Sequence, residues 1–547
     1  MPLSLAFSLL EIERLRLQER LDAAKSQTER NRLGQFATPG PLAEEIIQAT
    51  LPLLSPNPKQ SIRFVDPAFG TGSFYSALLR LAGSNQIEWA SGYEIDPHYG
   101  APAISLWQDT RLALSLADFT HQPLPAGEEG QFNLLICNPP YVRHHHIPAQ
   151  EKECLRLLVK QHTGISLSGL AGLYCYFMLL ADRWMAPGAV ACWLVPSEFL
   201  DVNYGSALKR YLLEQVTLLR IHRFDPTLVQ FKDALVSSVV VWLRKEPPPL
   251  NQAVAFSYGA TLGDPRISVA VTKEELQKQP KWSAYGHPSQ SGAATDVDGK
   301  LRLADLFSIK RGIATGANSF FILPPLQSEN AQLPARFLKP ILPSPRYLPS
   351  TEILADGQGL PLLEKRLFLL DCDLPESIVQ ARFPHLWRYL QKGVEKGIAE
   401  RYLCRHRSPW YSQEHRAPAP LLCTYMGRQT SANGHHPFRF FLNHSQATAA
   451  NVFLLLYPKA PLQKLIEDDP GLLRRLWQRL NNLSADEMIY QGRTYGGNLH
   501  KLEPKELANA TIDNFFAYGE PVAAYEQLHL LESSAVYTRS SVSDGAE

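Results

Sequence analysis

The segment Asn138-Pro139-Pro140-Tyr141 places an amide, a rigid turn and an aromatic ring directly after the apolar run Asn133–Cys137. An aromatic amine such as adenine N6 is a poor nucleophile, because its lone pair is delocalised into the ring. If the side-chain oxygen of Asn138 and the backbone carbonyl of Pro139 accept the two amine hydrogens, the nitrogen can pyramidalise and attack an activated carbon. Tyr141 can stack on the flat base. The segment therefore predicts chemistry at an exocyclic amine, which requires no strong base.

A second group of residues could hold a nucleotide-like cofactor. Gly70 and Gly72 follow the apolar run Ile62–Val65, and glycines in such a turn let the backbone approach a ligand closely. Glu94 follows the next apolar run, Ile87–Tyr93, where its carboxylate can accept hydrogen bonds from both hydroxyls of a ribose. The glycine turn, Glu94 and Asn138 thus follow one another along the chain, each after an apolar run. This order predicts a cofactor site beside the site where the amine would react.

These motifs resemble those of the N6-adenine DNA methyltransferases of type II restriction-modification systems, in the class whose cofactor motifs precede Asn-Pro-Pro-Tyr and whose target-recognition domain comes last. The resemblance covers the chain up to Lys245. It implies that S-adenosylmethionine donates a methyl group to the N6 amine of an adenine flipped out of double-stranded DNA. It also implies a cognate restriction endonuclease, encoded separately, as a partner.

The resemblance assigns roles to individual residues. Thr38, in the segment Gly34–Pro39, is the expected polar contact to the methionine part of the cofactor, and Asp118 is expected to receive the amine of the cofactor adenine, with Phe119 against its ring. Phe231 is expected to cover the other face of the flipped base. The implied cofactor-binding residues are Thr38, Asp66, Ala68, Gly70, Gly72, Glu94, Ile95, Asp118 and Phe119, and the implied catalytic residues are Asn138, Pro139, Pro140, Tyr141 and Phe231.

The elements that position these residues follow from the apolar runs between positions 62 and 245. Short runs punctuated by Gly, Pro and Asp alternate with helical stretches, which is typical of a largely parallel sheet covered by helices on both faces. We therefore predict an open α/β sheet that binds its ligands beyond the carboxyl ends of the strands, and the resemblance implies that it is a Rossmann-like methyltransferase sheet. The predicted strands are Ile62–Val65, Ile87–Tyr93, Phe132–Cys137, Ala189–Val195, Thr217–Phe224 and Leu235–Leu243.

Composition divides the chain into domains. Three successive prolines after Glu246 cannot continue a helix or a central strand, so a domain boundary is expected there. The irregular, aromatic-rich region from Leu301 predicts a separate C-terminal α+β domain that recognises the DNA target. The predicted order is a helical segment of open function at 1–33, the catalytic domain at 34–246, a connector at 247–300, the recognition domain at 301–530 and a disordered tail at 531–547.

Net charge gives little guidance on DNA binding, because the formal value is only +1 and such proteins often carry a basic excess. One local candidate is a mixture of arginines and aromatic residues that suits phosphate and base contacts, but it also fits an ordinary surface with ion pairs. Its arginines are Arg401, Arg405, Arg407, Arg416, Arg428 and Arg439. Lys310–Asn318 and Gly492–Lys501 resemble segments of the recognition domains of type II modification enzymes.

Other features favour no further function. No apolar stretch approaches the length of a membrane helix, no export signal is visible and the seven cysteines form no Cys-x-x-Cys pair, so we expect a soluble, cytoplasmic protein with reduced thiols. His144-His145-His146 predicts no metal site, because adjacent histidines do not share a face of a helix or strand. Glu503-Pro504-Lys505 has the acid-x-Lys shape of nucleases, but the proline argues against a paired catalytic strand, so no cleavage is expected.

Three alternatives stay open. A protein glutamine methyltransferase uses a similar Asn-Pro-Pro-Tyr segment, although Gly34–Pro39 and the long C-terminal region count against it. RNA adenine methylation requires the same chemistry as DNA adenine methylation. A noncatalytic DNA-binding protein on the same fold would be expected to have lost a catalytic residue, whereas Asn138, Pro139 and Tyr141 are all present.

Overall fold

The computed structural model describes residues 3–54, 61–127, 130–225, 237–286, 300–429, 436–495 and 499–513. The chain divides into two compact units, Met1–Ala293 with Tyr495–Asn498 and Ala294–Thr494 with Leu499–Glu547. Each unit has apolar cores of its own. No helix in these described ranges is long and apolar enough to cross a membrane.

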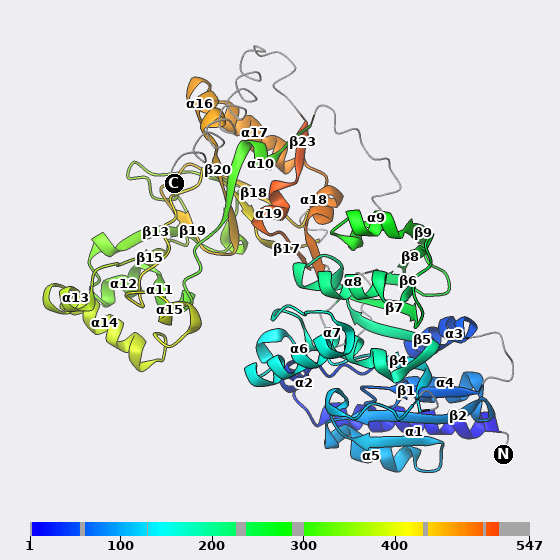
Figure 1. The fold of residues 1–547 in the computed structure, drawn as a ribbon. Coiled ribbons are helices and arrows are strands. Elements are labelled where there is room, and N and C mark those ends of the chain that lie inside the picture. The colour runs from blue at the N-terminus through cyan, green and yellow to red at the C-terminus, as the bar shows by residue number, and fades with distance from the viewer. Residues whose placement is uncertain are drawn as a thin grey trace, which may run out of the picture. The chain divides into compact units, whose positions relative to one another are not determined.

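The N-terminal unit is built on a nine-stranded sheet with the order β3-β2-β1-β4-β5-β7-β6-β8-β9 (Figure 1). The first five of these strands pair in parallel, whereas β7 runs antiparallel to β5 and β6. Since β1 pairs with β2 on one side and with β4 on the other, the strand order reverses at β1, which is where open sheets bind ligands. The strands are β1 (Ile62–Asp66), β2 (Ile87–Glu94), β3 (Leu112–Leu116), β4 (Phe132–Cys137), β5 (Met185–Pro196), β6 (Thr217–Phe224), β7 (Ser238–Arg244), β8 (Ala253–Gly259) and β9 (Ile267–Thr272).

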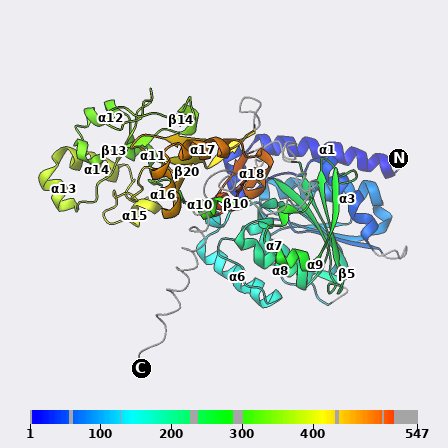
Figure 2. The ribbon, with the colours of Figure 1, turned by 90° about the horizontal axis from the view of Figure 1, so that it is seen from above.

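Helices cover both faces of this sheet, and Figure 2 shows α1 and α3 on one side of the strands and α7 and α8 on the other. On the first face, α3 (Gly40–Thr50), α4 (Ser73–Ala82) and α5 (Pro97–Trp107) contribute to one apolar core, and α1 (Leu3–Ala23) packs on α4 and α5. On the second face lie α6 (Ala149–Thr163), α7 (Leu173–Leu180) and α8 (Ser206–Glu214). Because both faces are covered, β4 is buried along its whole length.

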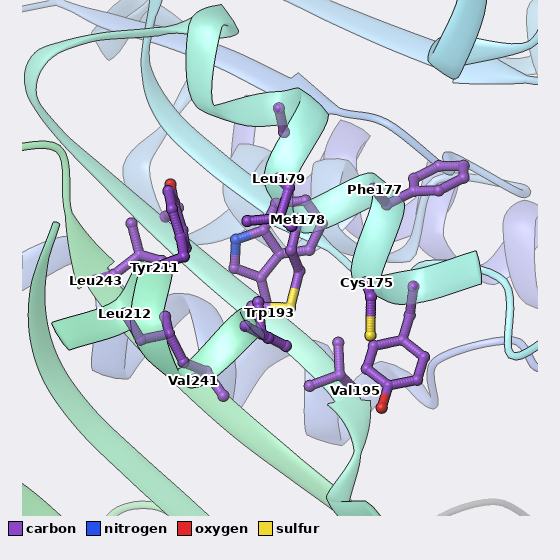
Figure 3. Packing of buried hydrophobic residues seen from close by; sticks show 14 of the residues in the cluster. Cys175, Phe177, Met178, Leu179, Trp193, Val195, Tyr211, Leu212, Val241 and Leu243 are labelled. Atoms are coloured by element: carbon purple, nitrogen blue, oxygen red, sulfur yellow. The ribbon is translucent and has the colours of Figure 1, made fainter. Parts of the chain in front are cut away.

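The core under the second face is formed by large side chains that interdigitate between α7, α8 and the strands (Figure 3). Trp193 on β5 is fully buried there, beside Tyr211 and Leu212 of α8. The other labelled members are Cys175, Phe177, Met178, Leu179, Val195, Val241 and Leu243. This packing fixes the position of β5, and with it that of its parallel neighbour β4, whose carboxyl end carries Asn138.

The predicted Rossmann-like α/β fold is confirmed, and the strands over Phe132–Cys137 and Thr217–Phe224 have the predicted bounds. Two features differ from the prediction. The edge strand β3 was not predicted, because its residues are mostly half-exposed or exposed and it lacks a continuous apolar run. The region expected as a connector from 247 contains β8 and β9, which extend the same sheet, and the helix α9 (Lys273–Lys278). The three prolines therefore occupy a loop between β7 and β8, where their lack of a backbone N–H breaks no hydrogen bond of a strand or helix.

The C-terminal unit has the predicted α+β character, with short sheets and helices around separate cores. Its largest sheet has the order β11-β20-β16-β18-β14, and a second sheet has the order β12-β15-β13-β19. Helices α10 (Leu303–Leu306), α16 (Ala460–Asp468), α17 (Leu472–Asn481), α18 (Ala485–Gln491) and α19 (Pro504–Ala508) accompany the larger sheet. Helices α11 (Asn318–Phe321), α13 (Glu376–Arg382), α14 (Pro384–Glu395) and α15 (Tyr402–Arg405) accompany the smaller one.

The strands of the C-terminal unit are short, and many of its connections are irregular. In the larger sheet they are β11 (Phe307–Arg311), β14 (Glu352–Ile353), β16 (Leu421–Thr424), β18 (Phe440–Asn443) and β20 (Phe453–Pro458). In the smaller sheet they are β12 (Ile322–Leu323), β13 (Leu338–Leu342), β15 (Phe368–Leu370) and β19 (Thr448–Ala449). A third sheet joins β17 (Met426–Arg428), β22 (Leu499–Lys501) and β21 (Arg493–Tyr495), and β10 (Lys300–Arg302) pairs with β23 (Thr511–Asp513).

Candidate active site

A cavity of about 710 Å³ lies at the carboxyl ends of β1, β2 and β4 in the N-terminal unit. It is lined by the turn after β1, by the residues that follow β2 and β3, by Asn138 and Pro140 after β4, and by side chains from the N-terminal segment. Of the residues predicted from the sequence, Thr38, Asp66, Ala68, Gly70, Glu94, Ile95, Asp118, Phe119, Asn138 and Pro140 line it. The topology of the sheet thus brings together residues that are up to a hundred positions apart in the chain.

The turn between β1 and α4 is held in a shape that leaves room beside its backbone. Gly70 and Gly72 both have positive φ values, of 57° and 90°. A Cβ on Gly72 would lie 2.6 Å from the Phe69 ring and 2.8 Å from Trp107 Nε1, so no larger residue fits there. Gly72 packs behind the turn and does not itself line the cavity, whereas Gly70 does.

The carboxyl group of Asp66 is buried and that of Glu94 is half-buried, and both accept hydrogen bonds from the backbone of this turn. The backbone N–H of Ala68 donates to Asp66 Oδ1 at 3.1 Å, and that of Gly70 donates to Glu94 Oε2 at 2.9 Å. Burial raises the pKa of Asp66 to about 7, with a further contribution from the nearby charge of Glu94. Burial also raises the pKa of Glu94, opposed by hydrogen bonds from backbone N–H groups. The pair can accept hydrogen bonds from a ligand and attract a cation.

The residues after β2 and β3 form another wall of the cavity. Ile95 is 66% exposed, which is unusual for a large apolar side chain and leaves its surface available to a ligand. Phe119 is buried, with its ring centroid 5.7 Å from that of Tyr93 and 5.6 Å from that of Phe177. Asp118 Oδ1 accepts hydrogen bonds from the backbone N–H and the hydroxyl of Thr120, which fixes the orientation of its carboxylate.

The side-chain amide of Asn138 is oriented by two acceptors. Its Nδ2 donates to the backbone carbonyl of Phe36 at 2.8 Å and to Thr38 Oγ1 at 3.1 Å. Its Oδ1 is buried and has no hydrogen-bond partner among the residues that the structure describes. A buried acceptor without a partner costs free energy, roughly 1–3 kcal/mol, and is a typical feature of a site that awaits a donor.

The other residues of the tetrapeptide are held by the main chain. The backbone N–H of Tyr141 donates to the carbonyl of Gly34 at 3.1 Å, and its hydroxyl donates to the carbonyl of Leu194 at 3.1 Å. Its ring lies 5.8 Å from that of Phe36, and only 8% of the residue is exposed. Burial raises the pKa of Tyr141. Neither Pro139 nor Tyr141 lines the cavity, and Phe231 lies outside the described residues.

The N-terminal helices contribute residues that were not predicted from the sequence. Gln18 and Asp22 of α1, Lys25, and Leu33 of α2 (Gln27–Leu33) line the cavity. Lys25 pairs with Asp96, which follows Glu94, and Gln35 Nε2 donates to the same carboxylate at 2.7 Å. The i, i+4 spacing of Gln18 and Asp22 places these two on one face of α1, which was the available signal, and Lys25 follows the helix.

One group in the described part of the chain has the spacing of a metal site. Asp118, His121 and Glu151 bring one ligand atom each within 4.8 Å of one another. Contacts within the protein explain why these side chains lie close together without a metal ion. His121 Nε2 lies 2.9 Å from Glu151 Oε1, and Asp118 accepts a hydrogen bond from the backbone N–H of Thr120. The three successive histidines form a separate 3-10 turn, His144–His146, with neighbouring rings in edge-to-face contact.

Four of the arginines that the sequence singled out differ in their contacts. Arg407 donates to the carbonyls of Ala314 at 2.5 Å and Thr315 at 3.0 Å, and Arg439 donates to that of Pro345 at 2.7 Å, so these two hold loops together. Arg401 and Arg405 are exposed. Glu503 accepts a hydrogen bond from Tyr425 at 2.7 Å, pairs with Lys501 and stands at the N-terminus of α19.

Sequence comparison identifies relatives that cover most of the chain. The model described as Eco57I restriction-modification methylase matches residues 71–229, and the one described as type II methyltransferase M.Eco57I, C-terminal domain, matches residues 291–536. Type II methyltransferase M.XamI of Xanthomonas campestris pv. amaranthicola is 30% identical over 496 residues, which cover 88% of this chain and 85% of that protein. Type II methyltransferase M.AccI of Acinetobacter calcoaceticus is 24% identical, with 87% and 85% covered.

Comparison of structures finds a similar fold in another restriction-modification enzyme. The type IIL restriction-modification enzyme MmeI, solved in complex with DNA, matches 98% of this chain and 71% of its own, with a TM-score of 0.50 and 12% sequence identity. The two family models match the catalytic and the C-terminal regions in the predicted order. The chain therefore belongs to the Eco57I-type family of type II restriction-modification methyltransferases.

Proposed function

We propose that this methyltransferase transfers a methyl group from S-adenosylmethionine to the N6 amine of an adenine that is flipped out of double-stranded DNA. The observation that carries the proposal is the buried, unpartnered Oδ1 of Asn138 at the edge of the cavity. An exocyclic amine supplies the hydrogen that this oxygen lacks. Asn138 is held by Phe36 and Thr38, so its acceptor is in place before the substrate arrives.

The cavity residues fit S-adenosylmethionine, which supplies a methyl carbon activated by a sulfonium. Glu94 would accept hydrogen bonds from the ribose hydroxyls, Asp118 would receive the amine of the adenine moiety, and Ile95 with Phe119 would contact its ring. Thr38 would contact the methionine part. The turn containing Asp66, Ala68 and Gly70 leaves space for a ligand against its backbone, and the acids at 66 and 94 complement a cationic cofactor.

The amine would be activated by acceptors alone. Asn138 Oδ1 and the carbonyl of Pro139 would each take one of its hydrogens, which localises the nitrogen lone pair. The amine is neutral when it attacks, and its proton becomes acidic only after transfer, so no general base is needed in the site. Pro140 keeps the turn rigid. We assign the two faces of the flipped base to Tyr141, which is held by Gly34 and Leu194, and to Phe231.

The C-terminal unit is proposed to recognise the DNA target. The matched relatives are type II methyltransferases of similar length, and MmeI was solved with DNA. Arg401 and Arg405 are exposed and suited to phosphate contacts. A separately encoded restriction endonuclease that cuts the same unmethylated site is the partner this activity implies.

The test is a transfer assay with radiolabelled S-adenosylmethionine and plasmid DNA, followed by digestion to nucleosides. The expected product is N6-methyladenine, and Asn138→Ala should give none. Label in N4-methylcytosine would contradict the assignment of the base. Preferential labelling of RNA, or of glutamine in a protein extract, would favour those alternatives. Methylation-sensitive sequencing of DNA from cells that express the protein would then identify the target site.

A further inference from the structure

An ion pair is buried between α1 and the start of α4. Arg14 is 1% exposed and Glu11 is 8% exposed. The guanidinium donates to both oxygens of the carboxylate, from Nε at 2.7 Å and from Nη2 at 2.8 Å. A buried charge is tolerated only when it is paired and its donors are used, and this geometry satisfies both conditions.

The remaining donor of Arg14 points at the turn that lines the cavity. Nη1 donates to Thr71 Oγ1 at 3.2 Å and to Ser73 Oγ at 3.0 Å. These two residues flank Gly72, in a turn made of small residues with two positive φ values. The backbone of the turn is held by other contacts, among them Trp107 Nε1, which donates to the carbonyl of Thr71 at 3.0 Å. The rigid guanidinium holds the hydroxyls of Thr71 and Ser73.

Other side chains extend the same network on both sides of the turn. The hydroxyl of Thr71 donates to Gln18 Oε1 at 2.6 Å, and the hydroxyl of Ser76 donates to Glu11 Oε2 at 2.6 Å. The hydroxyl of Ser73 donates to the carbonyl of Thr38 at 2.9 Å, and Thr38 in turn holds Asn138. Helix α1 is therefore connected to the turn through Arg14 and Gln18, to α4 through Glu11 and, through Ser73, to the amide of Asn138.

We infer that Arg14 is a positioning residue of the cofactor site and that α1 is an integral part of that site. This inference rests on the proposed function, because it assigns the cavity to S-adenosylmethionine. Arg14 does not line the cavity and acts through Thr71 and Ser73, which do. If the contact served packing alone, an apolar residue could fill the space without the cost of burying a charge.

The experiment compares Arg14→Met, Arg14→Lys and Arg16→Ala. Arg16 is exposed on the same helix, so its replacement is the matched control. Calorimetry with S-adenosylhomocysteine, without DNA, measures the cofactor Kd, and transfer assays separate KM for S-adenosylmethionine from kcat. DNA affinity and thermal unfolding are measured in parallel, so that a merely destabilised variant is recognised.

We expect Arg14→Met to raise the cofactor Kd and the KM by about tenfold, which corresponds to about 1.4 kcal/mol. Arg14→Lys should give an intermediate Kd, because a single ammonium can keep the pair with Glu11 but cannot fork to both hydroxyls. DNA affinity should be unchanged in all three variants, and Arg16→Ala should match the wild type.

A folded Arg14→Met protein with the wild-type Kd and KM overturns the inference. If Arg14→Met does not fold, Arg14→Lys decides alone, and a wild-type Kd in that variant also overturns it. Failure of the wild-type protein itself to bind S-adenosylhomocysteine would instead contradict the proposed function. The two failures are therefore distinguishable.

Discussion

Thr38 Oγ1 accepts a hydrogen bond of 3.1 Å from Nδ2 of Asn138, and the carbonyl of Phe36 accepts the other amide hydrogen at 2.8 Å. A rotation of the amide by half a turn would place Oδ1 against the Phe36 carbonyl, which has no hydrogen to donate. The amide is therefore fixed with Oδ1 away from Phe36 and Thr38, and this oxygen has no partner in the described part of the chain. The N-terminal motif thus orients the side-chain amide of Asn138 in the Asn-Pro-Pro-Tyr segment.

Replacement of Thr38 by valine should slow methyl transfer, because one of the two acceptors that orient Asn138 is lost. A hydrogen bond between neutral groups contributes about 0.5–1.5 kcal/mol, so we expect kcat to fall roughly two- to twelvefold. Thr38→Ser keeps the hydroxyl and is the matched control, with kcat close to that of the wild type. Single-turnover rates at saturating cofactor measure the effect, and equal rates in the valine and serine variants would refute the orienting role.

Asn138→Ala should remove methyl transfer while leaving the cofactor bound, because Asn138 is assigned to the amine and the acids at 66 and 94 to the cofactor. Loss of one pre-oriented group at a reacting centre lowers kcat by at least about 100-fold. The measurement is the transfer rate together with the Kd for S-adenosylhomocysteine. A variant that retains wild-type turnover would remove Asn138 from the mechanism.

Gly34→Ala should destabilise the catalytic turn. Gly34 has a φ of 66°, and a Cβ there would lie 2.4 Å from the backbone nitrogen of Tyr141. Gly164 offers a control, since its φ is 70° but its Cβ would meet nothing within 4 Å. Gly164→Ala should cost only the backbone strain of a left-handed residue, roughly 1–2 kcal/mol. Gly34→Ala should lower the free energy of unfolding further and also reduce transfer. Chemical denaturation and activity assays measure both, and equal effects of the two replacements would contradict the close approach.

Most of the site could be predicted from the sequence because it depends on strand ends. Asp66, Glu94 and Asn138 each follow an apolar strand, and the carboxyl ends of parallel strands meet at one edge of the sheet, so chain order alone brings them together. The cavity therefore contains the residues that the motifs singled out, apart from Gly72, Pro139 and Tyr141, while Phe231 lies outside the described residues.

The role of α1 could not be predicted in this way. The sequence predicts only a helical segment of open function at 1–33. In the structure Ile12 and Leu15 are 44% and 46% exposed, whereas Glu11 and Arg14 are buried. Polar residues usually face solvent, and only the tertiary contacts with Thr71 and Ser73 reveal that these two do not. In the same way, β8 and β9 lie beyond a proline-rich loop that resembles a domain boundary.

Arg407→Ala and Arg405→Ala should affect different properties of the C-terminal unit. Arg407 donates to the carbonyls of Ala314 and Thr315, so its loss should lower the free energy of unfolding by roughly 1–3 kcal/mol. Arg405 is exposed, and its loss should weaken DNA binding and reduce the slope of log K against log salt by about one. Anisotropy titrations at several salt concentrations, together with thermal unfolding, separate the two effects. A loss of stability in Arg405→Ala without any change in DNA affinity would contradict its assignment to phosphate.

Asp66 should make the stability of the protein without cofactor depend on pH. Burial raises its pKa to about 7 from the usual value of 3.8, so between these values the folded protein holds a proton that the unfolded chain releases. The contribution of Asp66 to stability is therefore fully present below the usual value and is lost as the pH rises to about 7, by at most about 1.4 kcal/mol per pH unit.

Asp66→Asn keeps an acceptor for the Ala68 N–H and does not titrate. Its melting temperature relative to the wild type should rise between about pH 5 and about pH 7 and then stay constant up to about pH 9. A difference between Asp66→Asn and the wild type that is the same at every pH would show that Asp66 ionises normally.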